Sequence, residues 1–84
     1  MNDRKFSALC RATVVKYVND RTDGNQITED DVFIVWLCKT LRNSKAMVST
    51  TLFDGMYFEL TYNGEKNELY VDAYKKSENI CIKL

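Results

Sequence analysis

Two carboxylates are the residues of this chain with the clearest capacity for acid–base chemistry. Glu59 and Asp72 stand in stretches where polar and apolar residues alternate, among tyrosines and hydroxyl side chains. A pair of carboxylates can serve as general acid and general base when burial separates their pKa values. The sequence contains no histidine, no glycine-rich phosphate loop and no nucleophile spaced from a base in a recognised way. We therefore expect two solvated strand residues here, and a protein that is not an enzyme.

Three cysteines, Cys10, Cys38 and Cys81, could in principle bind a metal or form a disulfide. Their number is odd, their spacing is wide, and each stands among apolar residues. A disulfide framework needs a denser, even set, and a zinc site needs close Cys or His pairs. We expect reduced thiols that serve as small core residues, with no metal and no other cofactor. Reduced thiols indicate a reducing compartment, the cytoplasm.

A basic cluster suggests a different chemistry, the binding of single-stranded nucleic acid. Lys39, Arg42 and Lys45 surround one predicted turn close to Trp36, and an aromatic ring can stack on a base while cations hold phosphates. Against this, Lys plus Arg and Asp plus Glu both number 12, so the net charge is zero, whereas nucleic-acid binders usually carry a basic excess. The same cluster is typical of a solvated turn whose charges discourage pairing at a sheet edge. Nucleic-acid binding is therefore the alternative hypothesis.

The composition indicates what kind of domain positions these residues. The chain has 84 residues, of which 45% are hydrophobic and 29% charged, and we expect one domain, residues 1–84. Neither a charged-then-apolar leader nor an apolar run of ~20 residues occurs, so we expect neither export nor a membrane span. Domains of this size often gain stability from a second subunit.

Residues 3 to about 20 have the periodicity of an amphipathic helix. The apolar or semi-apolar positions recur at the spacing of one buried stripe. They are Phe6, Leu9, Cys10, Thr13, Val14, Tyr17 and Val18. Asn2 or Asp3 can cap the start, and the turn-forming residues 19–25 should end the helix.

Residues 32–38, VFIVWLC, form an apolar run whose secondary structure is ambiguous. The preceding residues 28–31 resemble a helix start, with a capping hydroxyl followed by carboxylates. The run itself consists mostly of β-branched and aromatic residues, which favour a pleated strand. We favour the strand. If it is one, both of its faces are apolar, and one helix cannot cover both sides of a sheet.

The C-terminal half alternates in the manner of antiparallel strands. The predicted strands are residues 45–52, 56–62 and 67–74, with residues 80–82 as a last short strand or a continuation of the third. Glycine-containing turns separate the first three strands. The apolar pattern favours Leu52 opposite Met56 and Leu60 opposite Leu69.

These elements predict an α+β fold in which the N-terminal amphipathic helix packs on one face of an antiparallel meander sheet of about four strands. If residues 32–41 are helical, the alternative is two helices on a three-stranded sheet. The predicted core face comprises Val48, Leu52, Met56, Phe58, Leu60, Leu69, Val71 and Ala73.

The opposite face of the predicted sheet mixes tyrosines with carboxylates and hydroxyls. In the favoured register Tyr57 lies opposite Asp72, and Glu59 lies opposite Tyr70. The aromatic residues there, together with the two-sided apolar strand, indicate a surface that another protein covers, either a second copy in a homodimer or a host protein. The predicted contact residues are Trp36, Tyr57, Glu59, Tyr70, Asp72 and Tyr74.

Three stretches carry a resemblance to a known family. They are VWLCKTLRNSKAMVSTT, DGMYFELTYNGEKNELYVDAYKK and ENICIKL, which begin at Val35, Asp54 and Glu78. The chain from about Ile27 onwards resembles a family of small proteins of phages and prophages of Gram-positive bacteria, known only as a domain of unknown function. The resemblance implies expression in the cytoplasm of a bacterial host. It implies no activity, so it assigns no catalytic residue.

Overall fold

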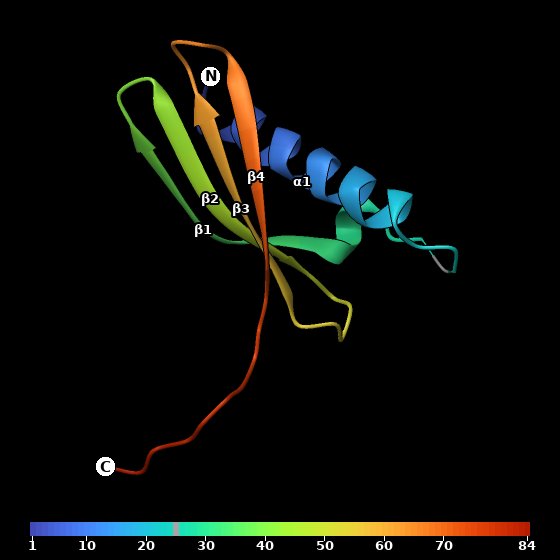
Figure 1. The fold of residues 1–84 in the computed structure, drawn as a ribbon. Helices are drawn as coiled ribbons and strands as arrows, with labels where there is room; N and C mark the ends of the chain where they lie inside the picture. The colour runs from blue at the N-terminus through green and yellow to red at the C-terminus, as the bar shows by residue number, and fades with distance from the viewer. Residues whose placement is uncertain (25) are drawn as a thin grey trace.

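The computed structural model describes residues 1–24 and 26–84, which form an α+β fold (Figure 1). Its elements are α1 (Asp3–Asp20), the 3₁₀ turn η1 (Glu29–Asp31), β1 (Val32–Thr40), β2 (Asn43–Thr50), β3 (Met56–Asn63) and β4 (Glu68–Lys75). The strands pair antiparallel in the order β1-β2-β3-β4, and α1 lies on one face of the sheet. The predicted meander with an N-terminal helix is confirmed, and the two-helix alternative is wrong because residues 32–40 form a strand.

Helix α1 begins and ends where the sequence predicts. The Asn2 side chain caps it by accepting a hydrogen bond from the Lys5 backbone N–H over 2.8 Å. Its buried residues recur every four positions and form one stripe, Phe6, Cys10, Val14 and Val18. After Asp20 the backbone turns away from the helix. Of the predicted turn 19–25, Asn25 lies outside the described residues.

The connection from α1 to β1 is held by two local motifs. The Asn19 side-chain amide both donates to the Ile27 carbonyl over 2.9 Å and accepts from the Ile27 N–H over 3.0 Å. The Asp31 carboxylate accepts from the Thr28 backbone N–H over 2.9 Å. The helix-start signal in residues 28–31 is therefore real, but it begins a single 3₁₀ turn, after which β-branched residues continue as a strand.

A β-bulge in β1 distributes its apolar residues between the two faces. Ile34 pairs with Val48, while Trp36 pairs with Met47, so Val35 is an extra residue without a partner of its own. Ile34 and Leu37 turn towards α1 and are half-buried, and Trp36 turns to the other face. The sequence left open which apolar set faces outward, and the bulge settles it.

Both predicted hairpin registers are wrong by two residues. Val48 pairs with Phe58 instead of Leu60, and Leu60 pairs with Val71 instead of Leu69. A shift of two keeps every side chain on its predicted face, because strand side chains alternate with a period of two. The faces are therefore correct although the partners are not.

The turns explain the shift of the first hairpin. The Thr50 hydroxyl accepts from the Leu52 N–H over 3.2 Å, and the Asp54 carboxylate accepts from the Met56 N–H over 3.0 Å. These bonds hold a loop of residues 51–55, longer than the predicted turn, and Gly55 adopts a φ of +70° within it. Leu52, predicted for the core face, is exposed as a result.

In the second hairpin, the Asn63 side chain accepts from the backbone N–H groups of Glu65 and Lys66. The loop 64–67 closes on the Asn63 and Glu68 pair.

The core lies between α1 and the sheet. Its buried apolar residues are Phe6, Cys10, Val14, Val18, Ile27, Val32, Ala46, Val48, Phe58 and Leu60. Tyr17 meets Phe58 edge to face, with ring centroids 5.3 Å apart. A helix is only about 10 Å wide, whereas four strands span about 19 Å. Leu69 and Val71 of β4 are accordingly half-buried, and Ala73, also predicted for the core face, is exposed.

Residues 76–84 leave the sheet after β4 as an extended segment (Figure 1). The predicted strand 80–82 is not formed, and β4 does not continue beyond Lys75. The segment runs on from β4 without a turn and does not pair with its own sheet.

Candidate protein-interaction surface

The sheet face turned away from α1, here called the outer sheet face, carries every predicted contact residue. Cross-strand pairing arranges its side chains in three rows from β1 to β4. The rows are Phe33, Ser49, Tyr57 and Tyr74; Trp36, Met47, Glu59 and Asp72; and Cys38, Lys45, Thr61 and Tyr70. Residues distant in sequence therefore form one continuous surface.

None of the described elements covers the outer sheet face, and its aromatic residues are accessible. Phe33 is 45% exposed, Trp36 42%, and Tyr70 and Tyr74 50% each. The bulged Val35 is also exposed. Large aromatic and aliphatic side chains that share an open face are typical of protein contact surfaces, because they bury much area at small entropic cost.

The charges on this face lie differently from the prediction. Glu59 pairs with Asp72, and Tyr57 pairs with Tyr74. Both predicted tyrosine–carboxylate pairings are therefore wrong by two residues. The Lys45 ammonium lies 3.3 Å from the Glu59 carboxylate and offsets the repulsion between the neighbouring acids. Glu59 therefore has a cation partner on β2, and Asp72 lies exposed on β4.

Tyr70 has a further polar contact on the edge strand. Its hydroxyl donates to the Glu68 carboxylate over 2.9 Å. This hydrogen bond and the negative charge of Glu68 raise the pKa of the Tyr70 phenol. The phenol is therefore a neutral donor throughout the physiological pH range.

The basic residues proposed to contact nucleic acid do not share a surface. Lys39 pairs with Ser44 on the helix side of the sheet, where its ammonium donates to the Met1 carbonyl over 2.9 Å. Lys45 lies on the outer sheet face beside Glu59, and Arg42 lies in the turn between β1 and β2. Lys39 and Lys45 therefore lie on opposite faces of the sheet, so the predicted cluster is not one basic patch.

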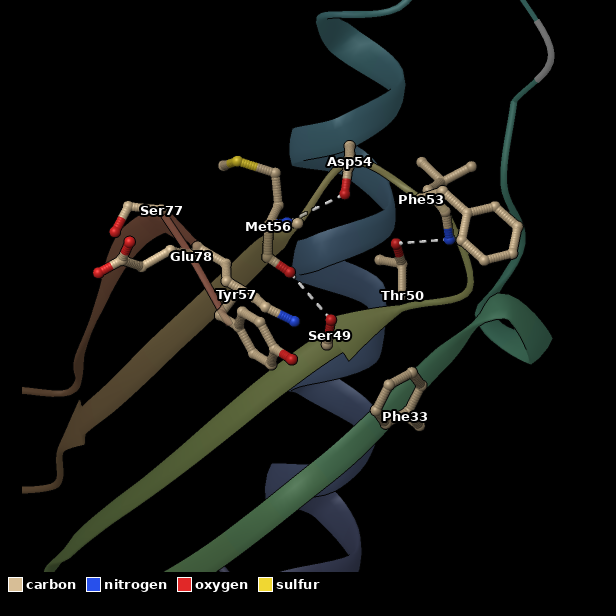
Figure 2. Close-up of a pocket in the computed structure, with 12 residues that line it drawn as sticks. Phe33, Ser49, Thr50, Phe53, Asp54, Met56, Tyr57, Ser77 and Glu78 are labelled. Atoms are coloured by element: carbon tan, nitrogen blue, oxygen red, sulfur yellow. Dashed lines mark hydrogen bonds between the residues drawn. The ribbon is translucent and has the colours of Figure 1, made fainter. Parts of the chain in front are cut away.

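A pocket of about 500 Å³ opens at one end of the sheet, between β1, the loop 51–55 and residues 76–78, which follow β4 (Figure 2). Phe33 and Tyr57 line it and connect it to the outer sheet face. Its polar groups serve the chain's own structure, since the Ser49 hydroxyl donates to the Met56 carbonyl over 2.9 Å. Phe53 on the loop is fully exposed.

The cysteines fit the prediction in part. Cys10 is buried in the core, and burial raises the pKa of its thiol to about 11. Cys38 and Cys81 are exposed, so their assignment to the core is wrong: Cys38 lies on the outer sheet face and Cys81 in residues 76–84. Apolar neighbours in a strand do not imply burial, because alternate side chains point to opposite faces.

Two further properties follow from the described part of the chain. Across residues 1–24 and 26–84, His, Cys, Asp and Glu side chains do not gather in groups of three or more that could bind a metal ion. Within the same residues, α1 lacks the apolar length needed to cross a bilayer.

The fold and the surface define a class: a small α+β protein with a meander sheet, covered by a helix on one face and open on the other. The chain belongs to the family of unknown function DUF6275, which matches residues 7–84. The expected resemblance to a domain of unknown function is confirmed, although the match begins within α1, well before Ile27. No match was found among curated proteins or solved structures.

Proposed function

We propose that this protein is a small non-enzymatic interaction module that associates with a second copy of itself through the outer sheet face. The observation that carries the proposal is the set of exposed aromatic residues that the sheet register assembles on this face. The cytoplasm of a bacterial host, with a phage or prophage as the source, is the setting that the family resemblance implies and forms part of the proposal.

The size of the face supports a stable contact. Three strands of eight residues and one of nine measure about 19 Å by 26 Å, or about 500 Å² in projection. Side-chain relief adds to this area, which brings it towards the ~800 Å² per partner of a standard interface. A second copy supplies a face of the same size and curvature, as a two-fold contact requires.

The charges support a second copy as the occupant. The face carries a cation on β2, Lys45, and an exposed carboxylate on the edge strand, Asp72. In a two-fold contact, Lys45 can approach Asp72 of the partner subunit twice. The chain's zero net charge adds no long-range repulsion between copies.

The experiment measures molar mass by light scattering after gel filtration, from micromolar concentrations upward. We expect Trp36→Ser to raise the dissociation constant of this contact about tenfold or more, because a large buried aromatic residue is typical of binding hot spots. Phe53→Ser is the control, since Phe53 is a fully exposed aromatic residue in the loop 51–55, off the face. Equal behaviour of the two variants, or a strict monomer at 100 μM (about the weak limit for a specific contact), contradicts the proposal.

A further inference from the structure

Residues 76–84, here called the terminal segment, have the pattern of a strand without a partner. Ile80, Ile82 and Leu84 occupy alternate positions and are 66%, 78% and 119% exposed. The segment runs away from the body of the molecule (Figure 1). Three large aliphatic side chains on one side of an extended segment are typical of a strand with one buried face. The family match to residues 7–84 includes this segment.

The edge of β4 offers free backbone groups for such a strand. The Lys76 N–H donates to the Gly55 carbonyl over 2.7 Å. In an antiparallel pair, alternate residues bond to the neighbouring strand, so this bond shows which residues of β4 bond to β3. Even-numbered residues of β4 therefore bond to β3. The backbone N–H and C=O groups of the odd-numbered residues 69–75 point to the open edge.

The other edge of the sheet is less suited to accept a strand. The bulge at Val35 interrupts the regular spacing of backbone groups along β1. The Arg11 guanidinium also donates to the Val32 carbonyl at the start of this strand. β4 is thus the regular edge, and the terminal segment is its direct continuation.

We propose that two copies of this chain exchange their terminal segments, so that residues 76–84 of each copy pair antiparallel with β4 of the other. The result is one continuous sheet across a two-fold axis, formed by strand addition. The contact runs along the edge of β4 and meets the outer sheet face only at its β4 margin, so it goes beyond the function proposed above and is tested separately.

Symmetry determines which side chains meet. Two antiparallel strands related by a two-fold axis perpendicular to the sheet have one residue that faces its own copy. A residue a given number of positions before it faces the residue the same number of positions after it in the partner. The residue numbers of each facing pair therefore add up to an even number. Odd-numbered residues of the segment face odd-numbered residues of β4, which are the residues with free backbone groups. Ile80, Ile82 and Leu84 then lie on the side of Tyr70 and Tyr74.

Charge selects the register. Centring the axis on Lys75 or Lys76 sets like cations opposite each other, and centring it on Glu78 sets two carboxylates opposite each other. Centring it on Ser77 places Lys76 opposite Glu78 of the partner subunit, twice. This register pairs Ile80 with Tyr74 and Leu84 with Tyr70. Ile82 then faces Asp72, between the two tyrosines, so two of the three aliphatic residues have a facing aromatic partner.

A cross-linking experiment tests the register. With the axis at Ser77, residue 73 faces Cys81 of the partner subunit, at a Cα separation of about 5.5 Å, which a disulfide can span. In a Cys38→Ser background, Ala73→Cys should give covalent dimers on mild oxidation, seen by non-reducing electrophoresis. Buried Cys10 does not compete.

Two matched controls flank this position. A cysteine in Val71→Cys or in Lys75→Cys faces Cys81 of the partner subunit only if the register is shifted by two residues. We expect them to stay largely monomeric under the same oxidation. Stronger cross-linking at either control position, equal cross-linking at all three, or none at Ala73→Cys overturns the proposed exchange.

Charge reversal supplies an independent readout in the full chain. Lys76→Glu and Glu78→Lys should each raise the dissociation constant of the edge contact about tenfold, because two attractive pairs become two repulsive ones. The double variant should restore it. Additive weakening in the double variant contradicts the register.

The two proposals fail separately. Trp36→Ser weakens the outer-face contact and should leave the cross-link from Ala73→Cys unchanged. A chain that makes both contacts assembles beyond the dimer, and loss of either contact leaves a dimer.

Discussion

Asn19 shows how a single side chain determines a connection that no periodic pattern specifies. Its amide group bonds both backbone groups of Ile27, which is buried at the end of the loop before η1. Arg11 performs a related role when it donates to the Val32 carbonyl. Both residues lie in α1 beside its buried stripe; Asn19 binds the loop that precedes η1, and Arg11 binds the start of β1.

We expect Asn19→Ala to lower the free energy of unfolding by about 1–3 kcal/mol, because it leaves the Ile27 backbone groups without partners in a partly buried site. Urea denaturation measures the change. Asp23→Ala, an exposed change in the same connection, should stay within about 0.5 kcal/mol of the parent. A similar loss in both variants would show that the Asn19 bonds contribute nothing specific.

Cys10 makes a prediction about reactivity and pH. Burial raises the pKa of its thiol from 9.0 to about 11, so the folded state holds the proton more tightly than the unfolded chain does. This contribution to stability is complete below pH 9.0 and is lost as the pH rises to about 11. In a Cys38→Ser, Cys81→Ser variant at pH 8, a thiol reagent should label Cys10 about 100-fold more slowly in the native state than in urea. Rapid native labelling would contradict the burial of Cys10.

At the scale of elements, the two turns at the far end of the sheet pack against each other. A Cβ added to Gly64 in the β3–β4 loop would overlap the carbonyl oxygen of Arg42 in the β1–β2 turn. The Asn43 side chain also accepts from the Gly64 N–H over 3.2 Å. These contacts join the two hairpins at their tips.

Gly64→Ala should therefore force the two turns apart and lower the melting temperature by about 4–16 °C, which corresponds to about 1–2 kcal/mol in a domain of this size. Gly24→Ala is the matched control, since an added Cβ there meets nothing within 4 Å. Thermal unfolding followed by circular dichroism measures both. An unchanged melting temperature for Gly64→Ala would contradict the close approach of the turns.

The elements also show what local patterns can and cannot predict. The α1 stripe and the alternation of β2, β3 and β4 place nearly every side chain on its correct face. The registers are wrong by two residues because side chains such as Thr50, Asp54 and Asn63 hold loops of their own preferred lengths. No sequence pattern marks the bulge at Val35, because the residues of this part of β1 are all apolar and do not alternate between apolar and polar.

At the scale of the whole molecule, the sheet is wider than the helix that covers it. The outer sheet face and the terminal segment together carry most of the large exposed apolar residues, and the β4 flank beside α1 is only half-covered. The elements formed by residues 1–24 and 26–84 leave these side chains exposed. This imbalance is the physical basis for proposing association.

Trp36 reports on that association directly, because it is the one tryptophan in the sequence. At 42% exposure in the isolated chain, its fluorescence should shift to shorter wavelength as the outer sheet face is covered. We expect this shift over the concentration range in which the molar mass rises. A rise in mass without any spectral shift would place the contact away from Trp36.

The sequence by itself determined the elements and the face of each residue, because helix and strand periodicities are local and a register shift of two preserves a strand's faces. It therefore predicted that Trp36, Tyr57, Glu59, Tyr70, Asp72 and Tyr74 share a surface. Only the tertiary structure decided the cross-strand partners, the separation of Lys39 from Lys45, the exposure of Cys38 and Cys81 and the unpaired state of residues 76–84. Those features depend on loop geometry and on which edges the folded chain leaves open, and no local pattern encodes either.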